Sequence, residues 1–240
     1  MRRPPPHLTA ARPGWCIVLP LKGGSAAKSR LGADPALAQA IAEDCLDAVL
    51  ACPGVRTAIV VTADPDTAGW AGSAGATVVT ESVPGAGLAA AIRDGLAGAH
   101  GPCAVLLGDL PALRPGDLRL ALDAAAQRLS ATLELAGARP AGRRPQRAGG
   151  SLPPMVFVPD AEGSGTVMLA AETPTAMDHA FGPGSAREHA RRGAVRLDLD
   201  LPRLRRDVDT EADLHAAAVL GCGPRTTARL AEAEGGRWVR

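Results

Sequence analysis

The chain has 240 residues, of which 46% are hydrophobic and 2% aromatic, and its formal net charge is +1. This length suffices for one α/β domain with a buried sheet and is short for two. The charge balance provides no overall field to attract nucleic acid or a membrane surface, so we expect neither partner. Basic residues gather at 139–147, where a solvated loop is the favoured explanation, and at 203–206.

The five cysteines are odd in number and lack CxxC spacing. Cys16 and Cys103 lie in apolar, strand-like runs, where a free thiol packs as a small hydrophobe. We therefore expect a reducing compartment and neither disulfides nor a zinc site. No apolar run has the length needed to span a bilayer. Prolines follow Arg2-Arg3 where a signal peptide would have an apolar core, so we expect a cytoplasmic protein.

Strands and helices alternate along most of the sequence. Residues 1–14 are rich in Pro and Arg and are predicted to form a flexible arm. Asp34-Pro35 predicts a helix start, with Asp as N-cap and Pro as first helical residue. Periodicity and β-branched runs predict strands at 15–21, 57–62, 77–80, 103–107, 155–158, 166–170 and 194–199. Helices are predicted from 35 to before Pro53, after 64–66, and over 88–99, 115–129 and 210–221.

This alternation predicts a single Rossmann-like α/β domain over 15–222, with a mostly parallel sheet and helices on both faces. An insertion loop is expected at 130–154 and a C-terminal tail at 223–240. The spacing of Ser185 and Glu188 predicts a capping box. Ligands of such sheets gather at the carboxyl ends of strands, here directly after Leu21, Thr62, Leu107 and Val158.

The loop from Lys22 to Arg30 follows the first predicted strand and contains Gly23 and Gly24. Both lysines of the chain, Lys22 and Lys28, fall in this loop, among 26 Lys and Arg residues in total. A lysine binds phosphate as a compact point charge. The loop is not a P-loop, because Ala27 precedes Lys28 and the glycine spacing differs. It suits a nucleotide triphosphate, with a solvated connection as the alternative.

Two acidic segments are candidates for a Mg²⁺ site. Asp109 follows an apolar strand, where a carboxylate can bind Mg²⁺ or cap a turn. Asp207 and Asp209 would share one face of an extended segment, where a cation would offset their repulsion. The alternative is that Asp209 or Thr210 caps the next helix. The histidines, His7, His100, His179, His189 and His215, are scattered and are expected on surface faces.

Five motifs occur together in order: LPLKGGSAAKSRL, GDLPAL, VPDAEGSGT, FGPGS and DVDTEADL. Over residues 15–222 the chain resembles the family of 2-phospho-L-lactate and phosphoenolpyruvate guanylyltransferases, which have the nucleotide-diphospho-sugar transferase fold and serve deazaflavin coenzyme biosynthesis. The resemblance implies metal binding by Asp109, Asp207 and Asp209. It also implies an acceptor site around Thr166, Gly182 and Ser185, where Ser185 would equally serve as a helix cap.

Two departures from the family pattern stand out. The family's segment after the third strand reads Gly-Leu-Asn-x-Ala, but Ala89 replaces the Asn after Gly87, which puts a nucleotide contact by that side chain in doubt. The Arg-rich stretch 139–147 is longer than the family's usual connection.

The resemblance implies transfer of GMP from GTP to phosphoenolpyruvate or 2-phospho-L-lactate, with 3-phospho-D-glycerate also open. Lys22, Lys28 and Arg30 would hold the triphosphate, near Gly23, Gly24 and Gly87, and Mg²⁺ would be the cofactor. The acceptor phosphate, with a second pKa of about 6, attacks without a general base. The alternatives are another nucleotidyltransferase, acting on a molybdopterin or sugar phosphate, and a catalytically silent nucleotide-binding regulator. A homodimer is left open.

Overall fold

The structure is a computed structural model, and it describes residues 14–21, 34–137 and 154–237. The strands are β1 (Trp15–Pro20), β2 (Val55–Thr62), β3 (Thr77–Thr80), β4 (Cys103–Leu106), β5 (Met155–Pro159), β6 (Thr166–Ala171) and β7 (Val195–Arg196). The helices are α1 (Pro35–Leu50), α2 (Pro65–Ser73), α3 (Leu88–Ala97), α4 (Pro115–Gly137), the 3-10 helix η2 (Pro174–Ala176), α5 (Ser185–Arg191), α6 (Pro202–Arg205), α7 (Glu211–Leu220) and α8 (Pro224–Arg237).

The strands form one seven-stranded sheet in the order β3-β2-β1-β4-β6-β5-β7. Strand β6 runs antiparallel to both neighbours, β4 and β5, and the other pairs are parallel. The predicted α/β fold with a mostly parallel sheet is therefore confirmed. Because β6 is reversed, it begins at the edge of the sheet where β4 and β5 end.

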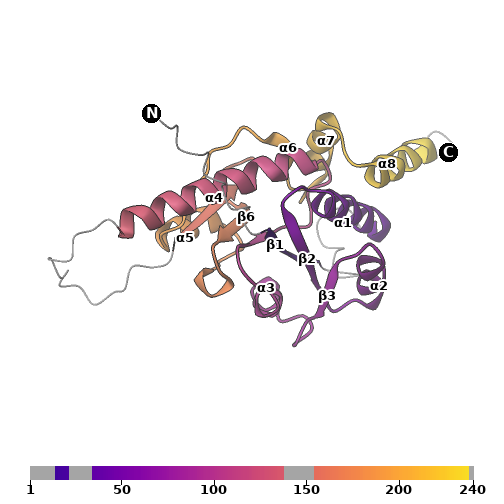
Figure 1. Cartoon of the computed structure of the whole chain (residues 1–240). Helices are drawn as coiled ribbons and strands as arrows, with labels where there is room; N and C mark the ends of the chain where they lie inside the picture. Colours follow the sequence, from indigo (N-terminus) through magenta and orange to yellow (C-terminus); the bar gives the residue numbers. More distant parts are fainter. Residues whose placement is uncertain (1–13, 22–33, 138–153, 238–240) are drawn as a thin grey trace, which may run out of the picture.

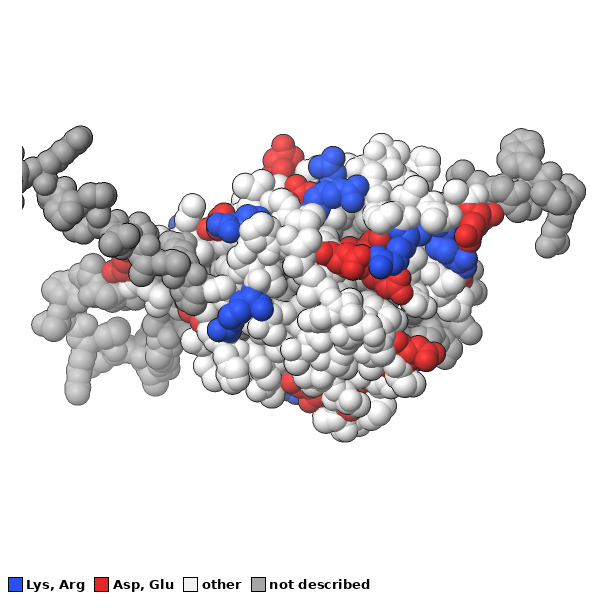
Figure 2. Space-filling model, turned by 45° about the vertical axis from the view of Figure 1, so that its right-hand side comes forward, with Lys and Arg blue, Asp and Glu red and all other residues white. Residues whose placement is uncertain are grey.

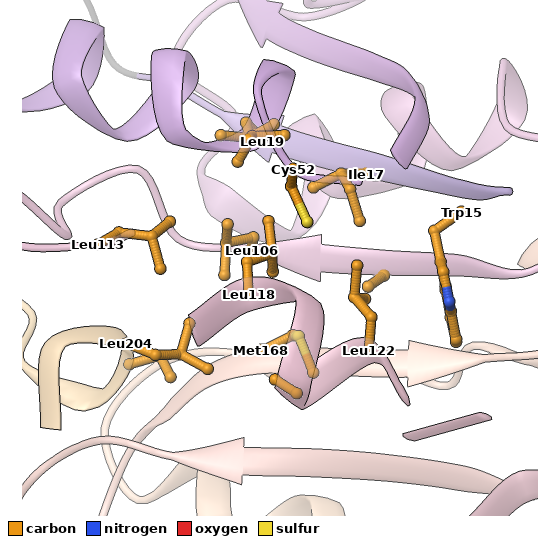
Figure 3. Packing of buried hydrophobic residues seen from close by; sticks show 14 of the residues in the cluster. Trp15, Ile17, Leu19, Cys52, Leu106, Leu113, Leu118, Leu122, Met168 and Leu204 are labelled. Atoms are coloured by element: carbon orange, nitrogen blue, oxygen red, sulfur yellow. The ribbon is translucent and has the colours of Figure 1, made fainter. Parts of the chain in front are cut away.

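Helices cover both faces of the sheet (Figure 1). Helices α1, α2, α4 and α6 pack on one face, and α3, η2 and α5 pack on the other. Figure 3 shows Ile17 of β1, Leu106 of β4 and Met168 of β6 facing Leu118 and Leu122 of α4. Alternate residues of a strand point to opposite faces, so each buried strand contributes to both cores.

A capping side chain determines where α1 begins, and a glycine allows α3 to pack closely on the sheet. The Asp34 side chain accepts a hydrogen bond from the Ala36 backbone N–H at 2.9 Å, and α1 begins at Pro35 as predicted. Gly95 allows α3 to approach β1, because a Cβ there would lie 2.5 Å from Cγ1 of Val18. Helix α3 is therefore held close to the strand that leads into the 22–30 loop.

Two helical segments lie where the sequence predicts loop or tail. Helix α4 continues to Gly137, into the segment assigned to the 130–154 insertion. Residues 224–237, assigned to the tail, form α8, which packs beside α1 (Figure 1). The buried Asp44 carboxylate accepts from the backbone N–H groups of Arg225 at 3.2 Å and Thr226 at 2.8 Å. Helix α8 is thus fixed to α1 through its first turn.

Two further predictions need correction. Gly184, not Ser185, is the N-cap of α5, and no side chain caps that helix, so the predicted Ser185–Glu188 capping box is absent. Thr210, one of the two residues that the sequence offered as a cap, is the N-cap of α7, and it forms a capping box with Asp213. The last strand is also shorter than the predicted 194–199.

All five cysteines are free thiols. Within residues 14–21, 34–137 and 154–237, no helix combines the length and the apolar character required to cross a membrane. On the face shown in Figure 2, acidic and basic side chains lie next to one another, and no continuous basic stripe crosses the described residues.

Candidate active site

The ends of three strands converge at one edge of the sheet. Leu106 of β4 pairs with Met168 of β6, and the Leu107 N–H donates to the Val167 carbonyl at 3.0 Å. Pro159 of β5 pairs with Thr166, the first residue of β6. Residues that follow β4 and β5 therefore lie at the same edge as Thr166, which is the edge where ligands of open α/β sheets bind.

A backbone hydrogen bond brings the second acidic segment to this edge. The Val208 N–H donates to the Asp109 carbonyl at 3.1 Å, which places Asp207 and Asp209 beside Asp109. Burial, followed by the negative charges of Asp109, Asp160 and Asp209, raises the pKa of Asp207 to about 7. Asp109 and Asp209 thus lie close enough to Asp207 to act on it electrostatically, and these are the three carboxylates that the sequence predicts as metal ligands.

Asp160 and Glu162 also belong to this acidic cluster. Asp160, Glu162 and Asp207 each offer an oxygen within 4.8 Å of the others. The buried Asp160 carboxylate accepts from the N–H groups of Ser164 at 2.9 Å and Gly165 at 2.6 Å, closing the 160–165 loop. Arg206 forms an ion pair with Glu162 at 2.6 Å, which leaves Glu162 partly neutralised.

The donor set at this edge fits a hard divalent cation. The side chains concerned are carboxylates, which are the ligands that Mg²⁺ and related ions prefer. Burial is the main cause of the raised pKa of Asp207, and the neighbouring carboxylates add to it; a cation among them would offset that repulsion. Asp160 and Glu162 were not singled out as metal ligands from the sequence, although Asp160 lies two residues after Val158, close to the position where ligands were expected.

The predicted acceptor residues lie beside the acidic cluster. Thr166 and Ser185 are both 2% exposed. Gly182 and Gly184 have φ values of 133° and 72°, and the Ser185 N–H donates to the Gly182 carbonyl at 3.0 Å, forming a tight turn. The Ala186 N–H donates to the Ser164 carbonyl at 3.1 Å. This bond attaches the 182–185 turn to the loop that leads into Thr166.

His189 is buried, contrary to the expectation that the histidines lie on surface faces. It is 0% exposed, and its Nδ1 lies 2.9 Å from Oγ1 of Thr166. Its Nε2 accepts from the Ala180 N–H at 2.9 Å. Burial, reinforced by the positive charge of Arg192, lowers the pKa of His189 to about 4, so the imidazole is neutral near pH 7.

Of the residues predicted to bind the nucleotide, Gly87 is among those that the structure describes. Gly87 precedes α3 with a φ of 92°, and a Cβ built on it would contact nothing within 4 Å. Lys22, Gly23, Gly24, Lys28 and Arg30 lie outside the described residues.

An open cavity of about 410 Å³ is lined by residues of the 160–162 segment, of α6 and of α7. Its lining includes Ala161, Leu201, Arg205, Arg206 and Leu220, and contains none of the predicted site residues.

Comparison with protein families first defines the class. Residues 23–179 match the model of the MobA-like NTP transferase domain. A crystal structure of a putative nucleotide-diphospho-sugar transferase from Desulfovibrio desulfuricans G20 has a TM-score of 0.57 at 13% identity, covering 92% of this chain and 95% of that one. A second structure, from Mycobacterium tuberculosis H37Rv, has a TM-score of 0.50 at 20% identity, covering 85% and 96%. The chain is a nucleotidyltransferase with this fold.

Closer relatives specify the family. A protein of Salinispora arenicola is 47% identical over 219 residues, covering 88% of this chain and 91% of the relative. A protein of Streptomyces scabiei is 42% identical over 232 residues, covering 90% and 96%. Both are named phosphoenolpyruvate guanylyltransferase. The chain belongs to the phosphoenolpyruvate guanylyltransferase family, which confirms the resemblance drawn from the motifs.

Proposed function

We propose that the protein transfers GMP from GTP to phosphoenolpyruvate and releases pyrophosphate, in the biosynthesis of a deazaflavin coenzyme. The names of relatives at 38–47% identity support this activity. The observation that carries it is the convergence of Asp109, Asp160, Asp207 and Thr166 at one sheet edge. A nucleotidyltransferase needs this combination, because catalysis is largely positioning and neutralisation of phosphate charge.

Asp109, Asp207 and Asp209 are the proposed ligands of Mg²⁺, and Asp160 offers a further oxygen next to Asp207. When bound, Mg²⁺ supplies positive charge that offsets the phosphate oxygens of both substrates. Lys22, Lys28 and Arg30 hold the triphosphate, with Gly23, Gly24 and Gly87 permitting close approach of the backbone. These assignments rest on the motifs and on the spacing of the acids.

Thr166, Gly182 and Ser185 are the proposed acceptor residues. Their segments are joined to one another by the bond from the Ala186 N–H to the Ser164 carbonyl at 3.1 Å. A phosphate monoester, with a second pKa of about 6, is already largely ionised near neutrality, so its oxygen can attack the α-phosphorus of GTP directly. The chain's role at the acceptor is therefore to orient the phosphate rather than to remove a proton.

The proposal is tested by incubating the protein with Mg²⁺, each nucleoside triphosphate and each candidate acid, followed by mass spectrometry of the products. We expect a guanylylated product and pyrophosphate with GTP and phosphoenolpyruvate. Product with 2-phospho-L-lactate alone would correct the acceptor. Failure to release pyrophosphate with any pair would refute the enzymatic activity and favour a nucleotide-binding regulator.

The other proposed partners follow from this chemistry. GTP and the phosphorylated acid are small soluble metabolites, so we place the protein in the cytoplasm. A homodimer remains the assembly to test by light scattering.

A further inference from the structure

A single buried imidazole connects the three segments that carry the proposed acceptor residues. His189 lies in α5, the helix that begins at Ser185. Its Nδ1 contacts Oγ1 of Thr166, at the start of β6. Its Nε2 contacts the backbone of Ala180, two residues before Gly182.

The direction of the hydrogen bonds determines the tautomer of His189. A backbone N–H can only donate, so the bond from Ala180 requires Nε2 to carry a lone pair and no proton. A neutral imidazole then has its proton on Nδ1, which faces Oγ1 of Thr166 at 2.9 Å. The His189 Nδ1–H therefore donates to the Thr166 hydroxyl.

This hydrogen bond determines whether the Thr166 hydroxyl donates or accepts in its other contacts. A hydroxyl carries one proton and two acceptor positions. Because Oγ1 of Thr166 accepts from His189, its own proton cannot be directed at that nitrogen. The hydroxyl is thereby prepared to donate to another acceptor, and a phosphate or carboxylate oxygen is the strongest class of acceptor.

Two aromatic rings and its burial hold the His189 ring in the orientation that directs Nδ1–H at Thr166. The chain contains two phenylalanines, and both pack against His189. The ring centroid of Phe157 lies 6.0 Å from that of His189, and the Phe181 centroid lies 5.1 Å away in an edge-on arrangement. The ring is buried and its pKa is lowered to about 4, so it remains neutral in the working range of pH.

We propose that His189 is a positioning residue for the acceptor: it orients the Thr166 hydroxyl as a hydrogen-bond donor to the phosphorylated acid and ties Thr166 to the turn that carries Gly182 and Ser185. The proposal rests on the proposed function, in which Thr166 contacts the acceptor.

Two substitutions at His189 separate its two hydrogen bonds. In His189→Asn the side-chain amide N–H can replace Nδ1–H and donate to Thr166, but the acceptor for Ala180 is lost. In His189→Gln the amide oxygen can replace Nε2 and accept from Ala180, but the donor to Thr166 is lost. We expect H189Q to raise KM for phosphoenolpyruvate about tenfold or more, with KM for GTP nearly unchanged. H189N should stay within about threefold of the wild type.

A double substitution tests whether His189 acts through Thr166. Thr166→Val should raise KM for the acid as H189Q does, and the double variant should be little worse than either single one. Equal increases in KM for both substrates in H189Q, additive losses in the double variant, or a loss in H189N equal to that in H189Q would overturn the proposal in favour of a purely structural role. Thermal unfolding of each variant identifies any that fail to fold.

A measurement without substrates keeps this inference distinct from the proposed function. Long-range ¹H–¹⁵N NMR of the wild-type protein reports which ring nitrogen of His189 is protonated. We expect the Nδ1–H form, with no titration between about pH 6 and pH 8. An Nε2–H form would overturn the inference even in an active enzyme. The Nδ1–H form in a protein that makes no product would instead count against the proposed function.

Discussion

The backbone N–H of Val208 donates to the carbonyl oxygen of Asp109 across 3.1 Å, joining two segments nearly a hundred residues apart in the chain. The bond leaves the flanking carboxylates of Asp207 and Asp209 beside Asp109, which contributes to the raised pKa of Asp207. Bringing these carboxylates together costs free energy because their negative charges repel, and such clusters are typical of sites that bind a cation.

Asp109→Asn should lower turnover about 100-fold or more, because it removes negative charge from the proposed metal site while keeping the shape of the side chain. Steady-state pyrophosphate release measures the loss. Asp123→Asn is the matched control, since Asp123 lies on α4 in an exposed ion pair with Arg119. Wild-type activity in D109N would exclude Asp109 as a metal ligand.

Asp160→Asn should reduce both stability and metal affinity. Its carboxylate accepts from the N–H groups of Ser164 and Gly165, and an amide can satisfy only one of them with its oxygen. We expect a loss of about 1–3 kcal/mol in the free energy of unfolding, measured by urea denaturation. Calorimetric titration with Mg²⁺ gives the second readout. Unchanged values in both experiments would show that neither role depends on the charge.

Asp44→Ala should destabilise the whole domain by about 1–3 kcal/mol, because the N–H groups of Arg225 and Thr226 lose their acceptor in a buried position. Asp47→Ala serves as the control, since Asp47 pairs with the Arg225 side chain at the surface and should contribute less than about 1 kcal/mol. Urea unfolding separates the two. Equal effects would mean that α8 is held by surface charge rather than by the buried cap.

Acid should destabilise the protein through His189. Its pKa is about 4 in the folded state and ordinarily 6.5, so the folded state resists protonation, and the contribution of His189 to stability falls as pH drops from about 6.5 toward 4. Burial is the main cause. Arg192 and His179 also lower the pKa, while Asp178 and Glu188 oppose the shift.

His189 alone should contribute a loss of about 2–3 kcal/mol between pH 7 and pH 4. The raised pKa of Asp207 acts in the opposite direction, so the His189 contribution is measured as the difference in urea unfolding between the wild type and a His189 variant at each pH. His189→Phe, which keeps an aromatic ring beside Phe157 and Phe181, should be less stable than the wild type at pH 7, and this deficit should shrink as pH falls to 4. An identical slope in the variant would assign the acid sensitivity to other groups.

The alternation of apolar strands and helices was sufficient to predict the α/β fold, because a strand that is buried on both faces has a short continuous run of apolar residues. The predicted strands from Trp15 to Leu107 are confirmed on this basis. Helix α8 was missed because its sequence is polar and its attachment depends on Asp44, about 180 residues earlier. A contact between residues so far apart in the sequence cannot be predicted from the pattern of neighbouring residues.

The position of the acidic residues at this sheet edge could be predicted in part. Asp109 and Asp207 follow from strand ends and charge spacing, whereas the burial of His189 does not. Half of the other residues in α5 are charged, and His189 is buried because Thr166 and Ala180 contact it from other segments. The start of α5 at Gly184 likewise depends on left-handed backbone geometry rather than on the Ser185–Glu188 spacing.

Because β6 runs antiparallel to β4 and β5, the sheet has a parallel part and a hairpin part, and the two carry different proposed site residues. Strands β1 to β4 are mutually parallel and lead into the proposed nucleotide and metal segments. The β5–β6 hairpin presents Asp160 and Thr166 from its turn, at the same edge. Connecting loops vary in sequence more readily than the strands that they join. If Thr166 contacts the acceptor as proposed, substitutions between Asp160 and Thr166 should change acceptor preference without altering the parallel strands that lead to the proposed nucleotide side.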